Sequence, residues 1–286
     1  MWNGRVGVWS RELRFGRDRG DARDAAAELE QLGYAALWIP DVGGPVFDAV
    51  GHLLAATKRT VIATGILNLW MHSAADVAQA YAALTSEHGD RFLLGIGVSH
   101  APLIDAGQPG RYRKPLAATA VFLDALDATP RPVPTERRVL AALGPRMLAL
   151  SASRARGAHP YLVTPEHTAS ARSTLGDGPW LLPEQTVILS DDADEARSIG
   201  TDWLRAYLAL PNYANNLLRS GFSEDDLAQV SDRLFDALIA WGDEDAITRR
   251  IAEHRAAGAD HVCIQVLTAD PTEFPRDQWR RIAAAV

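Results

Sequence analysis

The chain has 286 residues, of which 47% are hydrophobic and 23% charged, so it can bury a sizeable core. Its net charge of -7 excludes a protein that binds nucleic acid through its overall charge. It has no run of 18 apolar residues, so we expect no membrane partner. A single cysteine, Cys263, excludes an intrachain disulfide, and the first residues lack the apolar stretch of a signal peptide, so we expect a cytoplasmic protein.

Short apolar segments alternate with helical patterns through the first half of the chain. We expect each strand to be followed by a helix, in the order 5–9 and 21–32, 35–40 and 45–57, 60–67 and 73–88, and 92–98 and 114–128. The segment 60–67 is β-branched and apolar on both faces, which is typical of a parallel strand buried on both sides. Ser73 and Asp76 resemble a capping box at the start of the third helix.

The second half of the chain continues the same alternation. The expected pairs are 139–143 and 145–156, 161–163 and 165–175, 186–189 and 192 to about 258, and 261–267 and 276–286. Strict alternation indicates parallel strands joined by right-handed crossovers. Eight such units predict an α/β fold, a closed (β/α)8 TIM barrel, as a single domain over 1–286 with an insertion between strands seven and eight. The alternative is an open, doubly wound sheet.

Histidines after the strands are candidates for proton transfer. A barrel carries its functional residues at the carboxyl ends of its strands, and His100 and His72 lie in loops that follow strands. No two histidines have a metal-binding spacing such as HExxH, so we predict no metal site. The chain also lacks a GxSxG elbow, which argues against hydrolysis by a serine nucleophile.

Glycines at strand ends mark positions where a ligand could approach the backbone. Gly95 and Gly97 begin like a dinucleotide fingerprint, but the third glycine is missing, so a tight barrel corner or the close approach of a flat group are the alternatives. Gly65 indicates a bulge or a close contact, and a bulge would push Ile66 into the barrel mouth. Gly144 precedes a helix whose first amides suit a phosphate.

A small basic cluster lies in the long loop after the fourth strand. It consists of Arg111, Arg113 and Lys114. One interpretation is an ordinary solvated loop, and the other is contact with a phosphate or an anionic tail.

Four of the strand ends resemble those of the bacterial luciferase-like superfamily. The segments are 33–41 (GYAALWIPD), 63–68 (ATGILN), 89–97 (GDRFLLGIG) and 143–146 (LGPR), the last followed by ARGA at 155–158. Within the superfamily the chain is most similar to the actinobacterial F420-dependent oxidoreductases. The resemblance covers essentially the whole chain and implies a barrel that binds a flat deazaflavin or flavin ring in its mouth.

The resemblance also implies which residues hold the cofactor. It places a non-prolyl cis peptide at Gly65–Ile66 behind the ring, an acidic residue beside the ring and a phosphate turn after the fifth strand. The cofactor-binding residues that it implies are Asp41, Gly65, Ile66, Asn68, Gly97, Val98, Ser99, Gly144 and Arg146. The chain departs from its relatives at two positions, since it has Val42 where several relatives have histidine and His100 where some have a carboxylic acid.

These observations predict an oxidoreductase that transfers a hydride between coenzyme F420 and a small organic substrate. We take His100 as the first candidate for the catalytic proton donor and His72 as the second. An FMN-dependent monooxygenase of the same fold is the first alternative, because FMN and F420 share a tricyclic ring and a ribityl phosphate. A flavin- or deazaflavin-binding protein without turnover is the second. The resemblance further implies a homodimer formed through outer helices.

Overall fold

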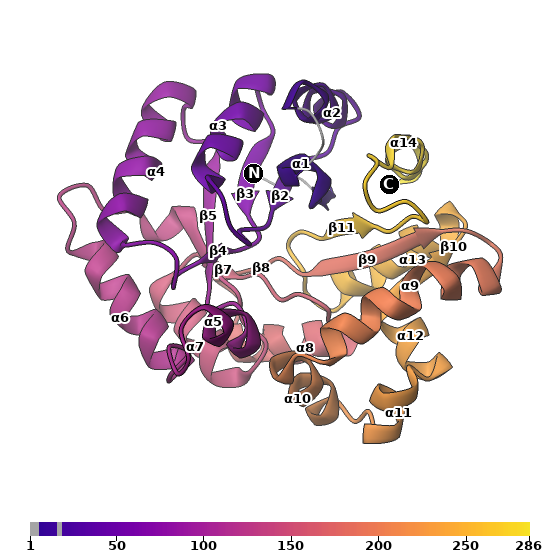
Figure 1. Ribbon diagram of the computed structural model, residues 1–286. Coiled ribbons are helices and arrows are strands. Elements are labelled where there is room, and N and C mark those ends of the chain that lie inside the picture. Colours follow the sequence, from indigo (N-terminus) through magenta and orange to yellow (C-terminus); the bar gives the residue numbers. More distant parts are fainter. Residues whose placement is uncertain (1–5, 16–18) are drawn as a thin grey trace.

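The computed structural model describes residues 6–15 and 19–286, in which the strands form one curled parallel sheet with helices on its outer side (Figure 1). Arg5, the expected start of the first strand, lies outside these residues. The first five strands are β1 (Gly7–Trp9), β2 (Ala36–Ile39), β3 (Val61–Thr64), β4 (Leu67–Asn68) and β5 (Phe92–Gly97). They lie in the order β1-β2-β3-β5, and β4 pairs with the carboxyl-terminal end of β5.

The remaining strands complete the curl of the sheet. They are β6 (Arg138–Leu140), β7 (Gly157–Ala158), β8 (Trp180–Leu181), β9 (Glu184–Leu189), β10 (Ile239–Gly242) and β11 (Cys263–Val266). β11 pairs with both β1 and β9, and β8 pairs with β7. Glu184 N donates to Pro160 O at 3.0 Å, so hydrogen bonding to the β7 segment continues past β8 onto β9. This α/β arrangement is consistent with the predicted (β/α)8 barrel.

Helices follow the strands and cover the outside of the sheet (Figure 1). None of them within the described ranges 6–15 and 19–286 combines the length and hydropathy of a membrane span. They are α1 (Glu12–Phe15), α2 (Arg19–Gln31), α3 (Val46–Ala56), α4 (Ala74–His88), α5 (Ala101–Gly107), α6 (Pro115–Asp127), α7 (Pro145–Arg154), α8 (Pro165–Leu175), α9 (Ala193–Leu208), α10 (Pro211–Arg219), α11 (Glu224–Gln229), α12 (Asp232–Leu238), α13 (Glu244–Ala256) and α14 (Arg276–Ala285), with a 3-10 turn at Thr135–Arg137.

Two expectations about secondary structure are wrong. The sixth strand lies at Gly157–Ala158 and not at 161–163, because Pro160 has no N–H to donate to the ladder and Leu162 has a left-handed φ of 56°. The expected long helix from 192 to about 258 is five helices and the strand β10, which pairs in parallel with β9. The prediction overlooked signals that end and start helices in this stretch. Gly221, which follows α10, has a φ of 91°, and the Ser223 side chain caps the start of α11.

Apolar side chains form separate cores on the two sides of the sheet. Inside the curl, Trp38, Ala63 and Val139 belong to one buried cluster, which places residues of β2, β3 and β6 on a common inner face. The larger outer cluster packs α2, α3, α4 and α6 against the alternate residues of the same strands. A third cluster joins α9, α10 and α12 to β9 and β10. It fixes the segment between β9 and β11 over the carboxyl ends of the strands.

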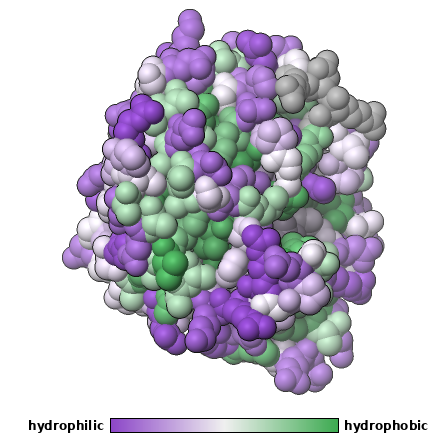
Figure 2. Space-filling view, turned by 60° about the vertical axis from the view of Figure 1, so that its left-hand side comes forward, coloured by the Kyte–Doolittle hydropathy of each residue, from purple (hydrophilic) through white to green (hydrophobic). Residues whose placement is uncertain are grey.

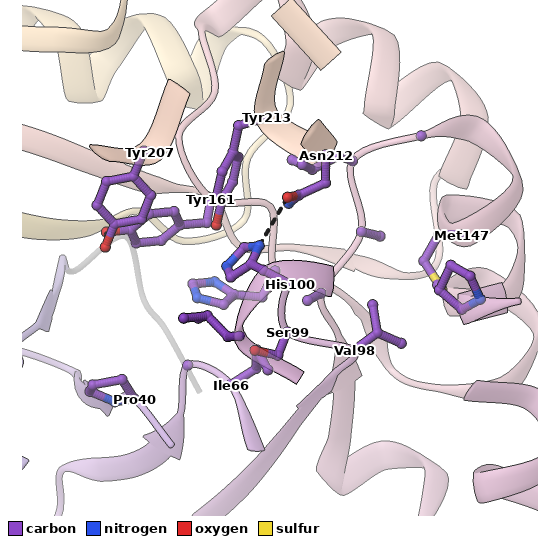
Figure 3. Close-up of a pocket in the computed structure, with 18 of the residues that line it drawn as sticks. Pro40, Ile66, Val98, Ser99, His100, Met147, Tyr161, Tyr207, Asn212 and Tyr213 are labelled. Carbon is purple, nitrogen blue, oxygen red and sulfur yellow. Dashed lines mark hydrogen bonds between the residues drawn. The ribbon is translucent and has the colours of Figure 1, made fainter. Parts of the chain in front are cut away.

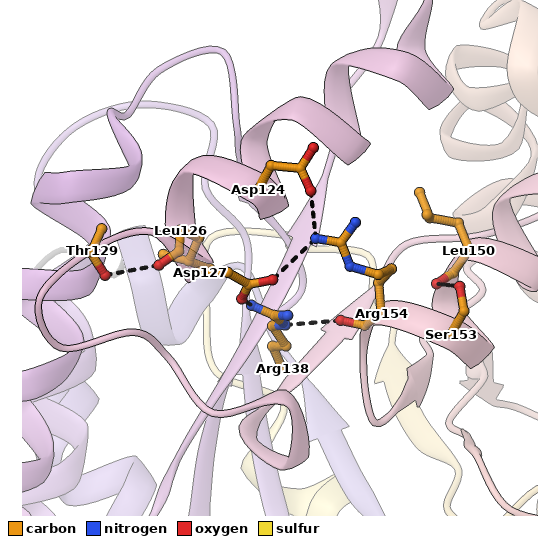
Figure 4. A network of polar contacts seen from close by, with 8 residues as sticks. All are labelled: Asp124, Leu126, Asp127, Thr129, Arg138, Leu150, Ser153 and Arg154. Carbon is orange, nitrogen blue, oxygen red and sulfur yellow. Dashed lines mark hydrogen bonds and ion pairs between the residues drawn. The ribbon is translucent and has the colours of Figure 1, made fainter.

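A buried arginine fastens the amino-terminal end of β6 to two helices (Figure 4). Arg138 is 1% exposed, and its Nη1 donates to Asp127 Oδ1 at 2.6 Å. Arg154 bridges Asp127 and Asp124 from the end of α7, at 3.0 and 2.7 Å. The hydrogen bond from Arg138 holds the pKa of Asp127 below its usual 3.8. This end of the sheet is opposite the cavity described below, so the network serves stability.

Removal of the carboxylate that faces Arg138 should destabilise the fold. We expect Asp127→Ala to lower the free energy of unfolding by about 1–3 kcal/mol, because it leaves a buried guanidinium without its partner. Asp124→Ala, which removes only an exposed ion pair with Arg154, should cost about 0–1 kcal/mol. Urea denaturation followed by tryptophan fluorescence measures both changes, and equal losses would contradict the role of Arg138.

The difference in stability between the wild type and Asp127→Ala should depend on pH. The folded-state pKa of Asp127 is depressed, so the stability that it contributes is complete above pH 3.8 and is lost as the pH falls below that value. The difference between the wild type and Asp127→Ala should therefore shrink on acidification.

Candidate functional site

A cavity of about 380 Å³ opens at the carboxyl ends of the strands (Figure 3). Its lining comes from the ends of β1, β2, β5 and β6, from the β3–β4 connection, and from α9 and α10. The carboxyl ends of parallel strands meet at one edge, which brings residues that are far apart in the sequence around one space. Seven predicted site residues line this cavity: Asp41, Gly65, Ile66, Val98, Ser99, His100 and Gly144.

The floor of the cavity is the peptide that joins β3 to β4. Gly65–Ile66 is a non-prolyl cis peptide, as the sequence resemblance implies. Trp9 Nε1 donates to Gly65 O at 2.9 Å, and Asp41 N donates to Ile66 O at 3.3 Å. These bonds fix the peptide between β1 and β2, so the backbone itself forms part of the binding surface.

The two glycines of β5 make room for the neighbouring strand. A Cβ on Gly95 would lie 2.0 Å from Thr64 O, and Thr64 Oγ1 donates to Gly95 O at 2.8 Å. A Cβ on Gly97 would lie 2.7 Å from Ile66 Cδ1. Gly97 is buried beneath Ile66 and does not itself line the cavity. The sequence left open whether these glycines form a tight barrel corner or admit a flat ligand. In the structure the groups that approach them closely are the Thr64 carbonyl of β3 and the Ile66 side chain.

Asp41 connects the predicted acidic position to the predicted histidine of the next loop. Its Oδ2 accepts hydrogen bonds from His72 Nε2 at 2.8 Å and from Asn68 N at 3.0 Å. Asn68 and His72 lie behind Asp41, outside the cavity lining. The Asp41 side chain is 0% exposed, and its Oδ1 has no hydrogen-bond partner within the described residues. Val42 lines the mouth and is 59% exposed.

His100 stands at the start of α5 with one ring nitrogen engaged. Its Nδ1 donates to Asn212 Oδ1 of α10 at 2.9 Å, which leaves Nε2 as an acceptor. Burial lowers the pKa of His100 below 6.5, and the bond to Asn212 opposes this shift. The imidazole is therefore neutral at pH 7. Sequence reasoning missed Asn212, because it lies 112 residues away from His100 in the segment that the sequence predicted as one long helix.

Three tyrosines form the wall beside His100 (Figure 3). Tyr161 lies 5.4 Å from Tyr207 and 6.0 Å from Tyr213 between ring centroids, and Tyr213 lies 5.2 Å from His100. Tyr161 Oη donates to Gln265 Oε1 at 2.6 Å. Burial raises the pKa values of Tyr161 and Tyr213 well above 10, so both keep their protons. Sequence reasoning did not single out these residues, because Tyr161 lay within the segment expected as the sixth strand and Tyr207 and Tyr213 lay within the expected long helix.

A further histidine, His159, lies under the floor. Its Nδ1 donates to Leu182 O at 2.7 Å, and its ring stacks on Trp38 at 4.3 Å between centroids. Burial lowers the pKa of His159 to about 4, so the ring is neutral at pH 7. It lines the cavity beside Gly65 and was not among the residues that the sequence predicted.

An arginine that the sequence did not predict lies at the opposite end of the cavity. Gly144 caps α7, and Arg219 of α10 lines the cavity with its Nη2 3.7 Å from the position of a Cβ on Gly144. Arg146, the predicted cation, is exposed on α7 and does not line the cavity. Pro145 has no N–H and the amides of Met147 and Leu148 donate to Gly144 O, so the Arg146 amide and the Arg219 guanidinium together make a place for an anion.

The basic loop borders the cavity without lining it. Tyr112 and Pro115 line the cavity, whereas Arg111, Arg113 and Lys114 are exposed around them. Arg111 Nη2 donates to the carbonyl of Trp70, which fixes this loop to the residues after β4. Within the described residues, no group of three or more His, Cys, Asp and Glu side chains could hold a metal ion.

Changes at Asn212 should shift the pKa of His100 in opposite directions. Asn212→Leu removes the bond that stabilises the charged ring and should lower the pKa of His100 further, whereas Asn212→Asp adds a negative charge and should raise it. Titration of the histidine rings by NMR measures both shifts. Asn215→Leu is the matched control, because Asn215 lines the cavity from the same helix without a bond to His100. A shift of the same size in this control would contradict the role of Asn212.

Comparison with known proteins gives matches to both the sequence and the fold. The family model described as luciferase-like monooxygenase matches residues 6–129. A Mycobacterium tuberculosis (strain ATCC 25618 / H37Rv) protein named "Putative coenzyme F420-dependent oxidoreductase Rv3520c" is 23% identical over 324 residues, which cover 89% of this chain and 92% of that protein.

Solved structures of related fold cover nearly the whole chain. An F420-dependent secondary alcohol dehydrogenase with an F420-acetone adduct has a TM-score of 0.75 at 14% identity, with 99% of this chain and 98% of that chain covered. The F420-dependent tetrahydromethanopterin reductase of Methanopyrus kandleri has 0.73 at 15%, with the same coverage. The FMN-bound 3,6-diketocamphane monooxygenase component of Pseudomonas putida has 0.69 at 14%, with 98% and 96% covered.

At these identities the structural likeness establishes the fold alone, and the family model supplies the sequence relationship. The matched segment contains the Gly65–Ile66 floor, Asp41 and the end of β5. The resemblance seen in the sequence is confirmed, because residues 6–129 match the model of the luciferase-like monooxygenase family.

Proposed function

We propose that this protein is an oxidoreductase that transfers a hydride between the deazaflavin coenzyme F420 and a small organic substrate. The observation that carries the proposal is the shape of one cavity, which has a backbone floor at Gly65–Ile66 and an anion-binding end at Gly144 and Arg219. A flat ring joined to a phosphate fits that arrangement. The names of the mycobacterial relative and of two structural neighbours support the choice of F420.

The distribution of charge along the cavity fits the two parts of such a cofactor. Among the lining residues, Asp41 is the acidic side chain and Arg219 the strongly basic one, and His100 and His159 are neutral at pH 7. Asp41 lies at the floor and Arg219 at the helix end. The ring would therefore contact mostly apolar and backbone groups, and the phosphate would meet Arg219 and the Arg146 amide at the start of α7.

The bound cofactor would supply the hydride chemistry, and the protein would supply position and proton handling. The Gly65–Ile66 peptide and Ile66 would support one face of the ring. Val98 and Ser99 would border its edge from the end of β5. His100 would exchange a proton with the substrate through Nε2, and His72 would act through Asp41, whose carboxylate it orients.

An FMN-dependent monooxygenase is the second candidate. FMN also joins a flat ring to a phosphate, and an FMN-bound monooxygenase component shares this fold. The exposed Arg111, Arg113 and Lys114 beside the cavity mouth favour F420, because its tail carries carboxylates that FMN lacks. A binding protein without turnover is less well supported, because it gives no role to the open Nε2 of His100.

Binding measurements with the purified protein separate the two cofactors. We expect oxidised F420 to bind with a sub-micromolar Kd and FMN more weakly, with fluorescence as the readout. Replacing Arg111, Arg113 and Lys114 together by glutamine should weaken F420 more than FMN. Tight binding of FMN alone would contradict the F420 proposal and favour the monooxygenase.

Arg219 should contribute to phosphate binding and not to ring binding. We expect Arg219→Met to weaken FMN about tenfold, which is about 1.4 kcal/mol, and to leave riboflavin, which has no phosphate, unchanged. Arg146→Met keeps the backbone amide of α7 and should have the smaller effect. Equal losses for FMN and riboflavin would exclude a phosphate contact, and the reverse order of the two variants would assign that contact to Arg146.

We also propose that the protein forms a homodimer through its outer helices. Apolar side chains gather in a band across the face shown in Figure 2, and Val121 of α6 is 67% exposed. An apolar surface on outer helices is the kind of surface that a second copy can cover.

A further inference from the structure

Two unpaired polar groups of opposite kind stand together in the cavity wall. The Tyr213 hydroxyl makes no hydrogen bond within the described residues, and burial keeps it protonated, so it is a donor without an acceptor. Nε2 of His100 is an acceptor without a donor, because Nδ1 carries the proton that goes to Asn212. The two rings lie 5.2 Å apart between centroids, and Figure 3 shows the Tyr213 hydroxyl and His100 in the same part of the cavity.

A hydroxyl group is the complement of this pair. It donates one hydrogen bond and accepts others, so one oxygen can donate to His100 Nε2 and accept from Tyr213 Oη. A carbonyl oxygen only accepts and leaves Nε2 unpaired as long as the ring is neutral. An unpaired buried polar group disfavours binding, so the resting site favours the alcohol over the ketone.

The cavity lining beside the pair is aromatic, and the buried carboxyl of Glu184, which interacts electrostatically with Tyr161 and Tyr213, is engaged by Thr186 Oγ1 and Leu162 N and does not line the cavity. Tyr161, Tyr207 and Trp9 form the adjacent wall, with Trp9 5.4 Å from Tyr161 between ring centroids. Asp41 lies at the floor of the cavity, where its Oδ2 is engaged by His72 and Asn68, and Arg219 lies at the helix end. A charged substrate group beside these aromatic rings would lose its hydration without gaining a counter-ion.

We propose that Tyr213 and His100 together bind the hydroxyl oxygen of an uncharged, largely apolar alcohol, which the protein oxidises. This inference rests on the proposed function, which names the hydride acceptor as an oxidised deazaflavin. It adds the substrate class, a catalytic role for Tyr213 and a positioning role for Asn212.

The reaction balances with groups already described. The C–H bond of the carbinol carbon breaks, and its electron pair leaves with the hydrogen as hydride to the deazaflavin. The O–H bond breaks, and its proton goes to His100 Nε2, so a C=O bond forms. The alcohol loses two electrons and the cofactor gains them. Tyr213 Oη donates to the oxygen throughout and stabilises the negative charge that develops on it. Asn212 keeps the other nitrogen protonated, so Nε2 is free to accept.

A binding experiment tests the pair without turnover. 1-Methylcyclohexanol has a hydroxyl but no hydrogen on its carbinol carbon, and methoxycyclohexane lacks the donor. We expect ligand-observed NMR to give a Kd for the alcohol at least fivefold lower than for the ether. Tyr213→Phe should weaken the alcohol about fivefold and leave the ether unchanged. The matched control is Tyr81→Phe, since the hydroxyl of Tyr81 on α4 is buried without a partner away from the cavity. Unchanged alcohol binding in Tyr213→Phe would overturn the proposal.

A turnover experiment tests the substrate class. With F420-loaded protein, cyclohexanol should bleach the deazaflavin absorbance, whereas a 2-hydroxy acid and an amino alcohol should not. Tyr213→Phe should lower kcat/KM about 10²-fold. Tyr81→Phe should leave it unchanged. Faster reaction with either charged alcohol would contradict the substrate class while the proposed function stands.

Failure of the proposed function gives a different result. If F420 does not bind in the titration, the proposed function falls. The NMR measurements still decide the Tyr213–His100 pair, because they use protein without added cofactor.

Discussion

The site depends on how closely β3 approaches β5. Gly95 and Gly97 have no side chains, so the Thr64 carbonyl and the Ile66 side chain occupy the space that a Cβ would fill. That approach fixes the Gly65–Ile66 peptide, which then receives hydrogen bonds from Trp9 of β1 and from the backbone of Asp41 after β2. The ends of four neighbouring strands, β1, β2, β3 and β5, are thereby held together, and the cavity floor is made of backbone.

The walls above that floor come from a separate part of the chain. The segment between β9 and β11 packs through its own apolar cluster and brings α9 and α10 over the strand ends. From α10 come Asn212, Tyr213 and Arg219, which reach His100, the aromatic wall and the turn before α7. Helix α10 thus contributes side chains to both ends of the cavity. A protein with a net charge of -7 concentrates positive charge where the proposed anion binds, at Arg219 and the amino-terminal end of α7.

Much of the fold and the lower half of the site could be predicted from the sequence. Strand and helix patterns repeat locally, and the motifs around Asp41 and Gly65 lie in residues 6–129, which match the family model, whereas Gly144 was predicted from the sequence resemblance alone. The prediction failed where local patterns were weak, at β7, which has two residues, and in the run from 192 to 258, where caps and glycines divide the helices. Asn212, Tyr213 and Arg219 were missed for that reason.

By itself the sequence determined the alternation of strands and helices and the candidates His72 and His100, because these follow from periodicity and short motifs, and the family resemblance implied the cis peptide at Gly65–Ile66. Only the tertiary structure decided what each candidate touches. It placed His72 on the buried carboxylate of Asp41, fixed the protonated nitrogen of His100 through Asn212, and put Arg219 at the turn where the sequence predicted Arg146. Hydrogen bonds between residues as much as 112 positions apart exist only once the sheet has curled and α10 has packed over it, and no local pattern encodes them.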